Sequence, residues 1–480
     1  MSEAYDLIVI GGGPAGYPAA IRAAQLGMKA LCIDGWVNRD GTPSFGGTCL
    51  NAGCIPSKAL LESSELYHRA NHEFAVHGIG VGKVQLDLAK MQERKMAVSK
   101  ANSGGVKLLF QANKVTGIHG YGRLLGNGQV GYRSLDGKEE KTFTAKHILI
   151  ATGSEPVNLS KIAPFDGDRV VDSWGALDFT EVPQRLGVIG AGVIGVELGS
   201  VWSRLGSKTV ILEALPTFLP MADQQIAKEG LRQFQKQGLD IRLGAKVLSA
   251  KVGKKEVTVE YEQGGEKKSE AFDKLIVAVG RRPYTKDLGI EAAGVVLDER
   301  GFVKVDAHYR TSAPGVYAVG DVIGGFMLAH KGIEEGVVLI EQLAGQKSEV
   351  NYNAIPSVIY TAPEIAWVGL TEEAAKAAGH EVKIGTSPFA ANGRARAMEA
   401  IAGLVKFVSD AKTDRVLGVH MVGPYVSEML AEAVLALEFG ATTEDIQLTM
   451  HGHPTLSEAF HEASLAVDGH AIHSANRPKR

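Results

Sequence analysis

Two glycine-rich segments of the same design constrain the fold more than any other feature of this 480-residue chain. The first is YDLIVIGGGPAG, from Tyr5 to Gly16, and the second is RLGVIGAGVIG, from Arg185 to Gly195. In each, a short apolar run leads into a GxGxxG pattern. This order predicts a strand, a tight turn and a helix that begins at the turn, as in the βαβ units that bind dinucleotides. The chain therefore contains an internal repeat of two such units.

Each repeat also closes on a similar strand and carries an acidic residue in a corresponding place. The closing strands are HILIATG, residues 147–153, and KLIVAVG, residues 274–280. Asp34 and Glu213 each end the apolar run of the second strand of their unit. An acidic side chain at this place accepts hydrogen bonds from a ribose hydroxyl group. Both units are therefore predicted dinucleotide sites, and the second unit is a candidate insertion within the first.

The rest of the chain indicates how these units are extended. Alternating patterns at Val130–Leu135 and Lys255–Glu262 suit antiparallel strands attached to the two parallel sheets. A helical pattern covers Ala329–Leu343, and strands such as Val416–Met421 alternate with helices such as Ser427–Phe439 further on. We therefore predict an α/β fold with two Rossmann-like domains, a central domain and a C-terminal α+β domain. The expected boundaries are 1–153, 154–279, 280–350 and 351–480.

The composition and the N-terminal sequence limit the binding partners and the cellular compartment that we expect for this protein. Hydrophobic residues make up 45% and charged residues 22%, as in ordinary globular proteins, and the formal net charge is −3. That charge gives no general attraction to nucleic acid or to an anionic membrane. The first apolar strand begins near Leu7, which leaves no room for a signal peptide. We therefore expect a cytoplasmic protein.

Two of the three cysteines lie close together in GGTCLNAGCIPSK, from Gly46 to Lys58. On an ideal helix Cys49 and Cys54 would be separated by a rise of about 7.5 Å, on different faces. A disulfide needs Cα atoms within about 7 Å, so a bond here requires irregular backbone, for which Gly53 gives the freedom. Pro56 suits an early helical position, and a thiolate at a helix start is stabilised by the helix dipole.

The alternatives for this pair are two buried free thiols or a metal site. A structural zinc site needs four Cys or His ligands, and nothing with ligand spacing accompanies the pair. His451 and His453 form an HxH pair, but no third ligand has suitable spacing. Redox chemistry is therefore the favoured interpretation, and no metal is expected.

Six separated motifs together resemble the flavoprotein disulfide reductases, the pyridine nucleotide-disulfide oxidoreductase family. They are the cysteine segment, the two glycine fingerprints, ATG at 151–153, GVYAVGD at 315–321 and HPTLSE at 453–458. The resemblance implies a homodimer with an FAD-binding domain, an NAD-binding domain, a central domain that completes the FAD site and an interface domain. LAHKGIEEG at 328–336 and HPTLSE are most similar to the branch that oxidises dihydrolipoyl groups with NAD⁺.

The same resemblance implies roles for individual residues. Cys54 would face the flavin, and Cys49 would exchange with the dithiol. Lys58 and Glu197 would pair beside the flavin, although alone they would be taken for a surface cation and a helix-face carboxylate. His453 and Glu458 would form the acid–base pair. The cofactor-binding positions implied are Gly11, Gly13, Gly16, Asp34, Gly47, Thr48, Lys58, Ala151, Thr152, Gly153, Gly190, Gly192, Val193, Gly195, Glu213, Gly280, Gly320, Asp321, Leu328, Ala329 and His330.

The choice between cofactors and between related activities follows from particular residues. Glu213 repels a 2′-phosphate, and no arginine follows it in Ala214–Pro216, so NAD is favoured over NADP. This absence also disfavours a glutathione reductase relative, the main alternative. A mercuric reductase would have further cysteines near its C-terminus, and a transhydrogenase or a non-catalytic NADH sensor would not need the cysteine pair. The expected partners are the lipoyl domains of 2-oxoacid dehydrogenase or glycine cleavage complexes.

Three positions depart from the family pattern. Pro18 lies early in the first fingerprint helix, where it is expected to remove a hydrogen bond and bend the start of that helix. Gly35–Phe45 is a longer polar loop than usual, with no evident role, and Ala52 replaces a larger apolar residue. None of the three is expected to touch the inferred chemistry, although the loop is placed to alter contacts with the adenine of FAD.

Overall fold

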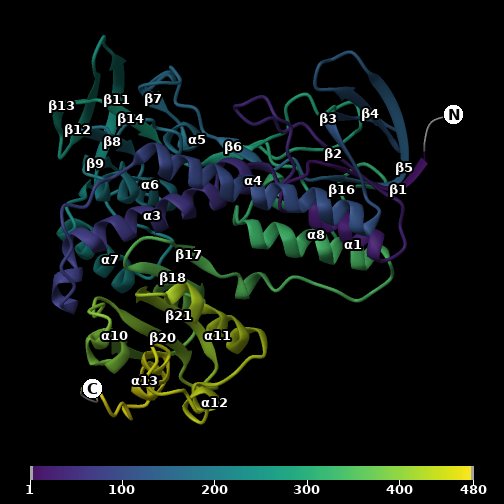
Figure 1. The fold of residues 1–480 in the computed structure, drawn as a ribbon. Helices are drawn as coiled ribbons and strands as arrows, with labels where there is room; N and C mark the ends of the chain where they lie inside the picture. Colours follow the sequence, from purple (N-terminus) through teal and green to yellow (C-terminus); the bar gives the residue numbers. More distant parts are fainter. Residues whose placement is uncertain (1–3, 477–480) are drawn as a thin grey trace.

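The computed structural model describes residues 4–476 and has three parts, which lie at the right, at the left and below in Figure 1. The first part is built on a parallel sheet with the strand order β3-β2-β1-β5-β16. The strand β4 pairs antiparallel with the outer ends of β3 and β5, as the alternating pattern predicted. The strands are β1 (Ala4–Ile10), β2 (Ala30–Asp34), β3 (Thr116–Gly126), β4 (Gln129–Ser134), β5 (Glu140–Ile150) and β16 (Val316–Ala318).

The second part repeats this plan. Its parallel sheet has the order β10-β9-β8-β14-β7, so β8, β9 and β14 occupy the places of β1, β2 and β5. A separate antiparallel sheet, β11-β12-β13, is attached to it. The internal repeat is therefore confirmed as two sheets of the same topology. The strands are β7 (Val170–Val171), β8 (Arg185–Ile189), β9 (Lys208–Leu212), β10 (Asp240–Arg242), β11 (Ala245–Val252), β12 (Val257–Gln263), β13 (Glu266–Phe272) and β14 (Lys274–Val277).

The second sheet is inserted into the first. The chain leaves the first sheet after β5 and returns to it only at β16, which pairs with the inner end of β5. The two crossing segments pair with each other as β6 (Ser154–Pro156) and β15 (Arg281–Pro283). The candidate insertion is therefore the arrangement found. The edge strand β16 lies in the stretch 280–350, for which we predicted a role in completing the first nucleotide site.

Helices cover both nucleotide-type sheets. Pro18 lies in the first turn of α1, where backbone N–H groups have no acceptor within the helix, and α1 continues without a break to Gln25. The bend expected at the start of this helix stays a prediction. No helix among the described residues is long and apolar enough to cross a membrane. The helices of these two parts are α1 (Gly16–Gln25), α2 (Gly47–Ala52), α3 (Cys54–His72), η1 (Phe74–His77), α4 (Leu88–Asn113), α5 (Ser173–Ala176), α6 (Val193–Arg204), α7 (Gln224–Lys236), η2 (Gly320–Ile323) and α8 (Ala329–Leu343).

The third part is an antiparallel sheet of order β17-β18-β21-β20-β19 with helices packed on it, which agrees with the predicted α+β domain. Its strands are β17 (Ser357–Ile359), β18 (Glu364–Gly369), β19 (Val382–Pro388), β20 (Leu404–Asp410) and β21 (Val416–Gly423). Its helices are η3 (Tyr352–Ala354), α9 (Glu372–Ala377), η4 (Phe389–Ala391), α10 (Gly393–Ala397), α11 (Val426–Glu438), α12 (Thr443–Gln447) and α13 (Glu458–Val467).

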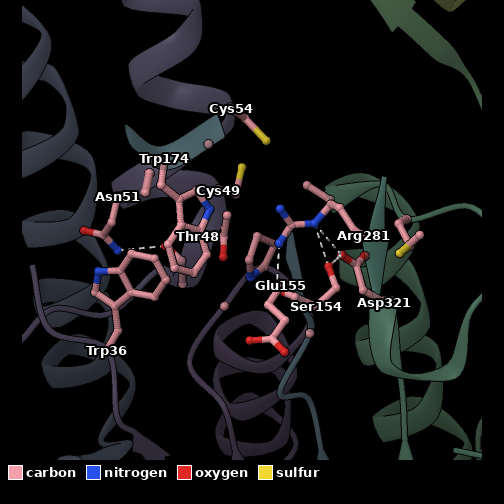
Figure 2. A pocket seen from close by; sticks show the side chains of 18 of the residues that line it. Trp36, Thr48, Cys49, Asn51, Cys54, Ser154, Glu155, Trp174, Arg281 and Asp321 are labelled. Carbon is pink, nitrogen blue, oxygen red and sulfur yellow. Dashed lines mark hydrogen bonds and ion pairs between the residues drawn. The ribbon is translucent and has the colours of Figure 1, made fainter. Parts of the chain in front are cut away.

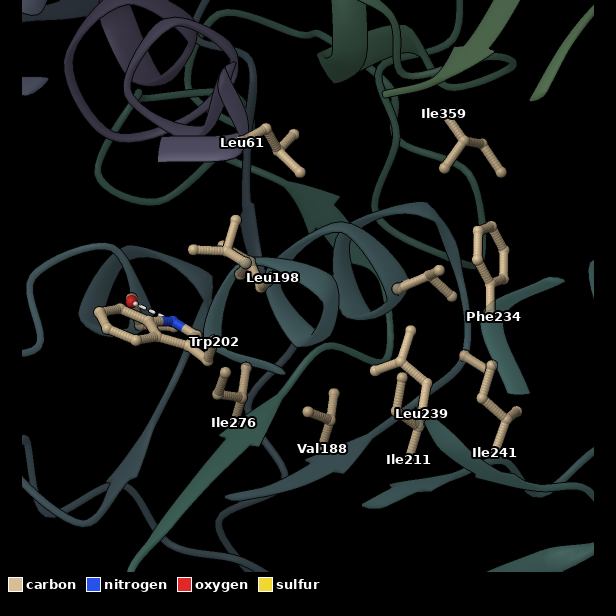
Figure 3. Packing of buried hydrophobic residues seen from close by; sticks show 14 of the residues in the cluster. Leu61, Val188, Leu198, Trp202, Ile211, Phe234, Leu239, Ile241, Ile276 and Ile359 are labelled. Atoms are coloured by element: carbon tan, nitrogen blue, oxygen red, sulfur yellow. Dashed lines mark hydrogen bonds between the residues drawn. The ribbon is translucent and has the colours of Figure 1, made fainter. Parts of the chain in front are cut away.

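One hydrophobic cluster joins the three parts, as Figure 3 shows. Leu61 enters it from α3, Leu198 and Trp202 from α6, Phe234 from α7 and Ile359 from β17. All five side chains are buried. Because burial of such side chains is the main favourable term in folding, this cluster fixes the three parts against one another.

Candidate active site

A cavity of about 3690 Å³ runs from the first sheet to the second, with the cysteine segment on its wall. Figure 2 shows part of it, with Trp36, Thr48 and Trp174 on one side and Ser154, Arg281 and Asp321 on the other. Most of the predicted site residues line it: Gly11, Gly13, Asp34, Gly47, Thr48, Cys49, Cys54, Lys58, Ala151, Thr152, Gly153, Gly190, Gly192, Val193, Glu197, Glu213, Gly280, Gly320, Asp321, Leu328, Ala329 and His330. Gly16, Gly195, His453 and Glu458 do not.

The two glycines outside the cavity bring each helix onto its glycine turn. A Cβ atom added to Gly16 would lie 1.8 Å from the Gly11 carbonyl oxygen, and one on Gly195 would lie 2.0 Å from the Gly190 carbonyl oxygen. Only glycine permits this approach, which places the starts of α1 and α6 at the cavity. Free N–H groups at a helix start favour anions, so both turns suit a pyrophosphate.

Asp34 is a buried carboxylate with one oxygen atom that is available to accept a hydrogen bond from a ligand. It is only 8% exposed, and its Oδ1 accepts a hydrogen bond from the Trp36 N–H at 3.2 Å. Its Oδ2 is buried without a hydrogen-bond donor among the described residues. Burial raises the pKa of Asp34 to about 7, against the lowering effect of nearby backbone N–H groups. A ribose hydroxyl group would satisfy Oδ2, so the first site fits a dinucleotide.

The cysteine segment has the irregular backbone that we predicted. The helix α2 ends at Ala52 and α3 begins at Cys54, with Gly53 between them at φ −144° and ψ −114°. A Cβ on Gly53 would lie 2.9 Å from the Thr48 carbonyl oxygen, so glycine permits the tight break. Both cysteines are free thiols here, and Figure 2 shows their sulfur atoms facing each other. This is the reduced form of the predicted couple, and the disulfide form stays a prediction.

The two thiols are electrostatically unequal. A hydrogen bond from Cys49 lowers the pKa of Cys54 to about 7, although burial opposes this, and the positive charge of Lys58 adds to the lowering. The same hydrogen bond, together with burial, raises the pKa of Cys49 well above its ordinary value. Cys54 is therefore the thiolate of the pair near neutral pH, with Cys49 as its hydrogen-bond donor.

This inequality predicts how the reduced protein reacts with iodoacetamide. The alkylation rate of Cys54 should rise through pH of about 7, below its ordinary value of 9.0, because only the thiolate reacts. Mass spectrometry over a pH series gives the midpoint for each cysteine. Lys58→Met should move the midpoint for Cys54 upward, because a stabilising charge is lost. A midpoint near 9 in the unmodified protein would contradict the inequality.

Lys58 is held by groups from the second and third parts of the chain. Its Nζ donates to Glu197 Oε2 at 2.9 Å and lies 4.6 Å from the centre of the Tyr360 ring. Burial alone would lower the pKa of Lys58, but Glu197 raises it above its ordinary value. Glu197 Oε1 also accepts the Tyr360 N–H at 2.9 Å. The predicted pair is thus in contact, and Tyr360 is a third member that the sequence did not indicate.

Arg281 is a further site residue that sequence reasoning missed. Its guanidinium donates from Nε to Ser154 Oγ at 2.7 Å and from Nη2 to the Ser154 carbonyl oxygen at 2.6 Å. Ser154 Oγ in turn contacts Asp321 Oδ2 at 2.5 Å, so this network fixes the predicted Asp321 carboxylate. Burial lowers the pKa of Arg281, and Asp321 opposes that effect. The available signal was its position directly after Gly280, at the end of a closing strand.

The second nucleotide site is organised by Glu213. Its Oε2 accepts the Ala191 N–H at 2.8 Å, and its Oε1 accepts the Leu215 N–H at 2.9 Å. The carboxylate therefore lies beside the glycine turn that precedes Val193, the first residue of α6. Its remaining acceptor capacity suits a ribose hydroxyl group and opposes a phosphate.

The predicted acid–base pair is formed, but it lies outside the cavity that the cysteines of the same chain line. His453 Nδ1 is 2.7 Å from Glu458 Oε1, and the Thr455 N–H donates to Glu458 Oε2 at 2.9 Å. Burial opposes the shift, but these hydrogen bonds lower the pKa of Glu458 below its ordinary value. The His453 side chain is 79% exposed. The chain thus presents an oriented imidazole on the surface of its third part.

The HxH pair does not form a metal site. His451 Nε2 lies 2.8 Å from Glu432 Oε1, and its side chain is buried, whereas His453 pairs with Glu458. Across residues 4–476 no group of three or more His, Cys, Asp or Glu side chains could hold a metal ion.

Comparison with known proteins agrees with this geometry. Residues 5–336 match the model for pyridine nucleotide-disulphide oxidoreductase, and residues 355–464 match the dimerisation domain of that family. Dihydrolipoyl dehydrogenase of Cupriavidus necator is 51% identical over 471 residues, which are 98% of this chain and 99% of that protein. The mitochondrial dihydrolipoyl dehydrogenase of Sus scrofa is 48% identical over 473 residues, which are 97% of this chain and 91% of that protein.

Solved structures are similar over the same length. LpdA from Mycobacterium tuberculosis superposes with a TM-score of 0.87 at 26% identity, over 96% of this chain and 99% of that one. The HOCl-induced flavoprotein disulfide reductase RclA from Escherichia coli, in its Cu(II) complex, gives a TM-score of 0.84 at 28% identity, over 97% of this chain and 99% of that one.

Proposed function

The chain belongs to the pyridine nucleotide-disulphide oxidoreductase family, and from this premise we propose that it oxidises dihydrolipoyl groups and reduces NAD⁺, the activity of a dihydrolipoyl dehydrogenase. The proposal rests on one observation: two cysteines with unequal thiol pKa values lie in the same cavity as two glycine turns that suit dinucleotides. The family implies FAD and NAD(H) as cofactors. Its dimerisation domain supports a homodimer.

The residues present fit both cofactors. In the first site Asp34 and the glycine turn would hold the ADP half of FAD, and Asp321, fixed through Ser154, would hold its ribityl chain. In the second site Glu213 and the turn before Val193 would hold NAD. FAD, when bound, takes up the electron pair of the dithiol and passes it to NAD⁺. The proposed domains are 1–153 for FAD, 154–279 for NAD, 280–350 to complete the FAD site and 351–480 for the dimer interface.

The side chains of the protein would carry the thiol chemistry. His453 of the partner subunit removes the proton from a dihydrolipoyl thiol, and Glu458 orients that imidazole. The resulting thiolate attacks Cys49 of the oxidised pair, so the Cys49–Cys54 bond breaks and Cys54 leaves as a thiolate. The second substrate thiol then displaces Cys49, which takes up a proton. The products are an oxidised lipoyl group and the protonation state that the structure favours, a Cys49 thiol beside a Cys54 thiolate.

A two-by-two assay tests this proposal. Purified holoprotein is supplied with dihydrolipoamide and NAD⁺ or NADP⁺, and separately with glutathione disulfide and NADH or NADPH. Oxidation of dihydrolipoamide with NAD⁺ is expected to dominate. Preferred reduction of glutathione disulfide would place the protein with another branch of the family. We further propose that the physiological substrates are lipoyl domains of 2-oxoacid dehydrogenase or glycine cleavage complexes.

Glu213 should determine the preference for NAD. Glu213→Ala is expected to lower kcat/KM for NAD⁺ by roughly 10- to 100-fold, because a charge-assisted hydrogen bond of about 1.5–3 kcal/mol is lost. Glu213→Gln keeps an acceptor without the charge, and should therefore lose less with NAD⁺ while gaining with NADP⁺. The flavin content of both variants, measured by absorbance, should equal that of the unmodified protein. Equal use of NAD⁺ and NADP⁺ by the unmodified protein would disprove the assignment.

A further inference from the structure

The long polar loop 35–45 is an ordered hairpin. It connects β2 to α2, and inside it the Asn38 N–H donates to the Thr42 carbonyl oxygen at 2.9 Å. At its start the Trp36 N–H bonds Asp34, the predicted ribose ligand. At its end the Phe45 ring stacks on His119 at 4.2 Å. Both ends of the loop are therefore fixed beside the first nucleotide site.

The loop reaches a residue from a distant part of the chain. The rings of Trp36 and Trp174 meet edge to face, with centroids 5.2 Å apart and planes at 67°. Trp36 is further oriented by its Nε1–H, which donates to Asn38 Oδ1 at 2.9 Å. Trp174 belongs to α5, which lies after the crossing segment β6. Both rings line the cavity, and Figure 2 shows them on one wall.

The indole nitrogen of Trp174 points to a ligand. Its Nε1 is buried and has no acceptor among the described residues. An indole N–H is a donor only, and a buried donor without a partner costs about 1–3 kcal/mol. Because Trp174 lines the cavity of the predicted FAD site, an oxygen atom of the cofactor is the acceptor that would remove this cost.

The segment that carries Trp174 is braced from two sides. Asp178 pairs with Arg39 of the loop at 2.9 Å and with Lys95 of α4. Lys95 Nζ also donates to the Leu177 carbonyl oxygen at 2.8 Å. The brace on α4 is buried, whereas the Arg39 side chain is largely exposed. The buried contacts with α4 thus fix the position of Trp174, and the loop 35–45 packs against Trp174 from the other side.

We propose that Trp36 and Trp174 form a clasp that closes over FAD in the first nucleotide site, with the Trp174 indole N–H donating to an oxygen atom of the cofactor. Opening of this clasp limits the release of FAD. The proposal rests on the proposed function in that FAD must occupy this site. It assigns a role in cofactor retention to the loop that departs from the family pattern, and to two side chains outside the thiol chemistry.

The release rate of FAD from the holoprotein tests the clasp. It is followed by the rise of free-flavin fluorescence after dilution. Trp36→Ala and Trp174→Ala should each release FAD roughly tenfold faster, because an edge-to-face pair and its cover are lost. The double variant should not multiply the two effects, since the rings act on each other. Trp36→Phe keeps an aromatic ring and should stay close to the unmodified protein.

Two further variants separate the parts of the proposal. Trp174→Phe keeps a ring but lacks the N–H, and should release FAD roughly threefold to tenfold faster. Arg39→Ala is the matched control, because it alters the same loop at an exposed ion pair of small effect. Release as fast in Arg39→Ala as in Trp36→Ala would mean that attachment of the loop matters and not the ring, which would overturn the clasp.

Thermal unfolding distinguishes retention from simple packing. Trp36→Ala should lower the midpoint of the FAD-loaded protein by more than that of the flavin-free protein, because weaker binding of FAD to the folded state adds to the loss of the ring contact. An equal fall in both midpoints, or unchanged release rates, would reject the clasp while the proposed function stands. A protein that never binds FAD would reject the proposed function itself.

Discussion

Cys49→Ser and Cys54→Ser are each expected to reduce the oxidation of dihydrolipoamide to background, with flavin content unchanged. A serine hydroxyl group forms no disulfide, so the electron pair of the dithiol has no route into the protein. Steady-state assays with NAD⁺ measure the loss. This is the largest effect expected of any single substitution in the chain, because the whole route and not one contribution to it is removed.

The two serine variants should differ from each other in a way that the unequal thiols predict. In Cys49→Ser, Cys54 keeps the neighbouring Lys58 and should still react with iodoacetamide near neutral pH. In Cys54→Ser, burial of Cys49 should leave it unreactive there. Identical alkylation profiles would contradict the assignment of Cys54 as the thiolate.

Cys32 provides the matched control for both variants. It lies on β2 with an exposure of 0%, and burial raises the pKa of its thiol. Cys32→Ala should therefore retain full turnover. Dithiol oxidation that survives in Cys49→Ser, or that disappears in Cys32→Ala, would show that the redox pair is wrongly identified.

His453→Gln should lower dihydrolipoamide turnover by roughly 10²–10⁴-fold, the usual contribution of a general base. The fold and flavin content should be unaffected, since the ring is largely exposed and its bond to Glu458 is local. Glu458→Gln should have a milder effect because the base remains but is less well oriented. Rates measured over a pH series identify the loss as one of proton transfer.

The position of His453 predicts a site shared between two chains. The imidazole lies outside the cavity that holds the cysteines, and nearby Leu448 and Met450 are exposed, the latter by 96%. Exposed apolar side chains beside a functional group, in a dimerisation domain, are typical of a surface that a second copy covers.

Mixed dimers test the shared site directly. Inactive His453→Gln chains and inactive Cys49→Ser chains, refolded together, should recover activity, because one site of each mixed dimer combines an intact imidazole with an intact cysteine pair. Chains that carry both substitutions, mixed with either single variant, form the control that should recover no activity, because no site then combines an intact imidazole with an intact cysteine pair. Absence of recovery in proven mixed dimers, or full activity in a stable monomer, would exclude the shared site.

The sequence predicted those features that depend on local patterns. The glycine fingerprints and Asp34 follow from the geometry of a strand, a turn and a helix, and the helical pattern of Ala329–Leu343 matches α8 residue for residue. The break at Gly53 followed from the reach of a disulfide. Each of these inferences needs only residues that are close in the chain.

The features that were missed depend on contacts between distant segments. Tyr360, the residue directly after β17, contacts Lys58 although the two are about 300 residues apart in the chain, and nothing in its own neighbourhood indicates this. Trp174 meets Trp36 because α5 lies beside the first nucleotide site, a consequence of the insertion and not of a motif.

The insertion of the second sheet into the first has a consequence for biosynthesis. The strand β16, which covers one edge of β5, is made after the entire second sheet, so a growing chain on the ribosome displays the uncovered edge of β5 over more than 150 residues of synthesis. Unpaired edges recruit other strands. The second sheet has all its strands before residue 280 and is able to fold first. The nascent chain would then complete its first sheet, by adding β16, only after the second sheet has folded.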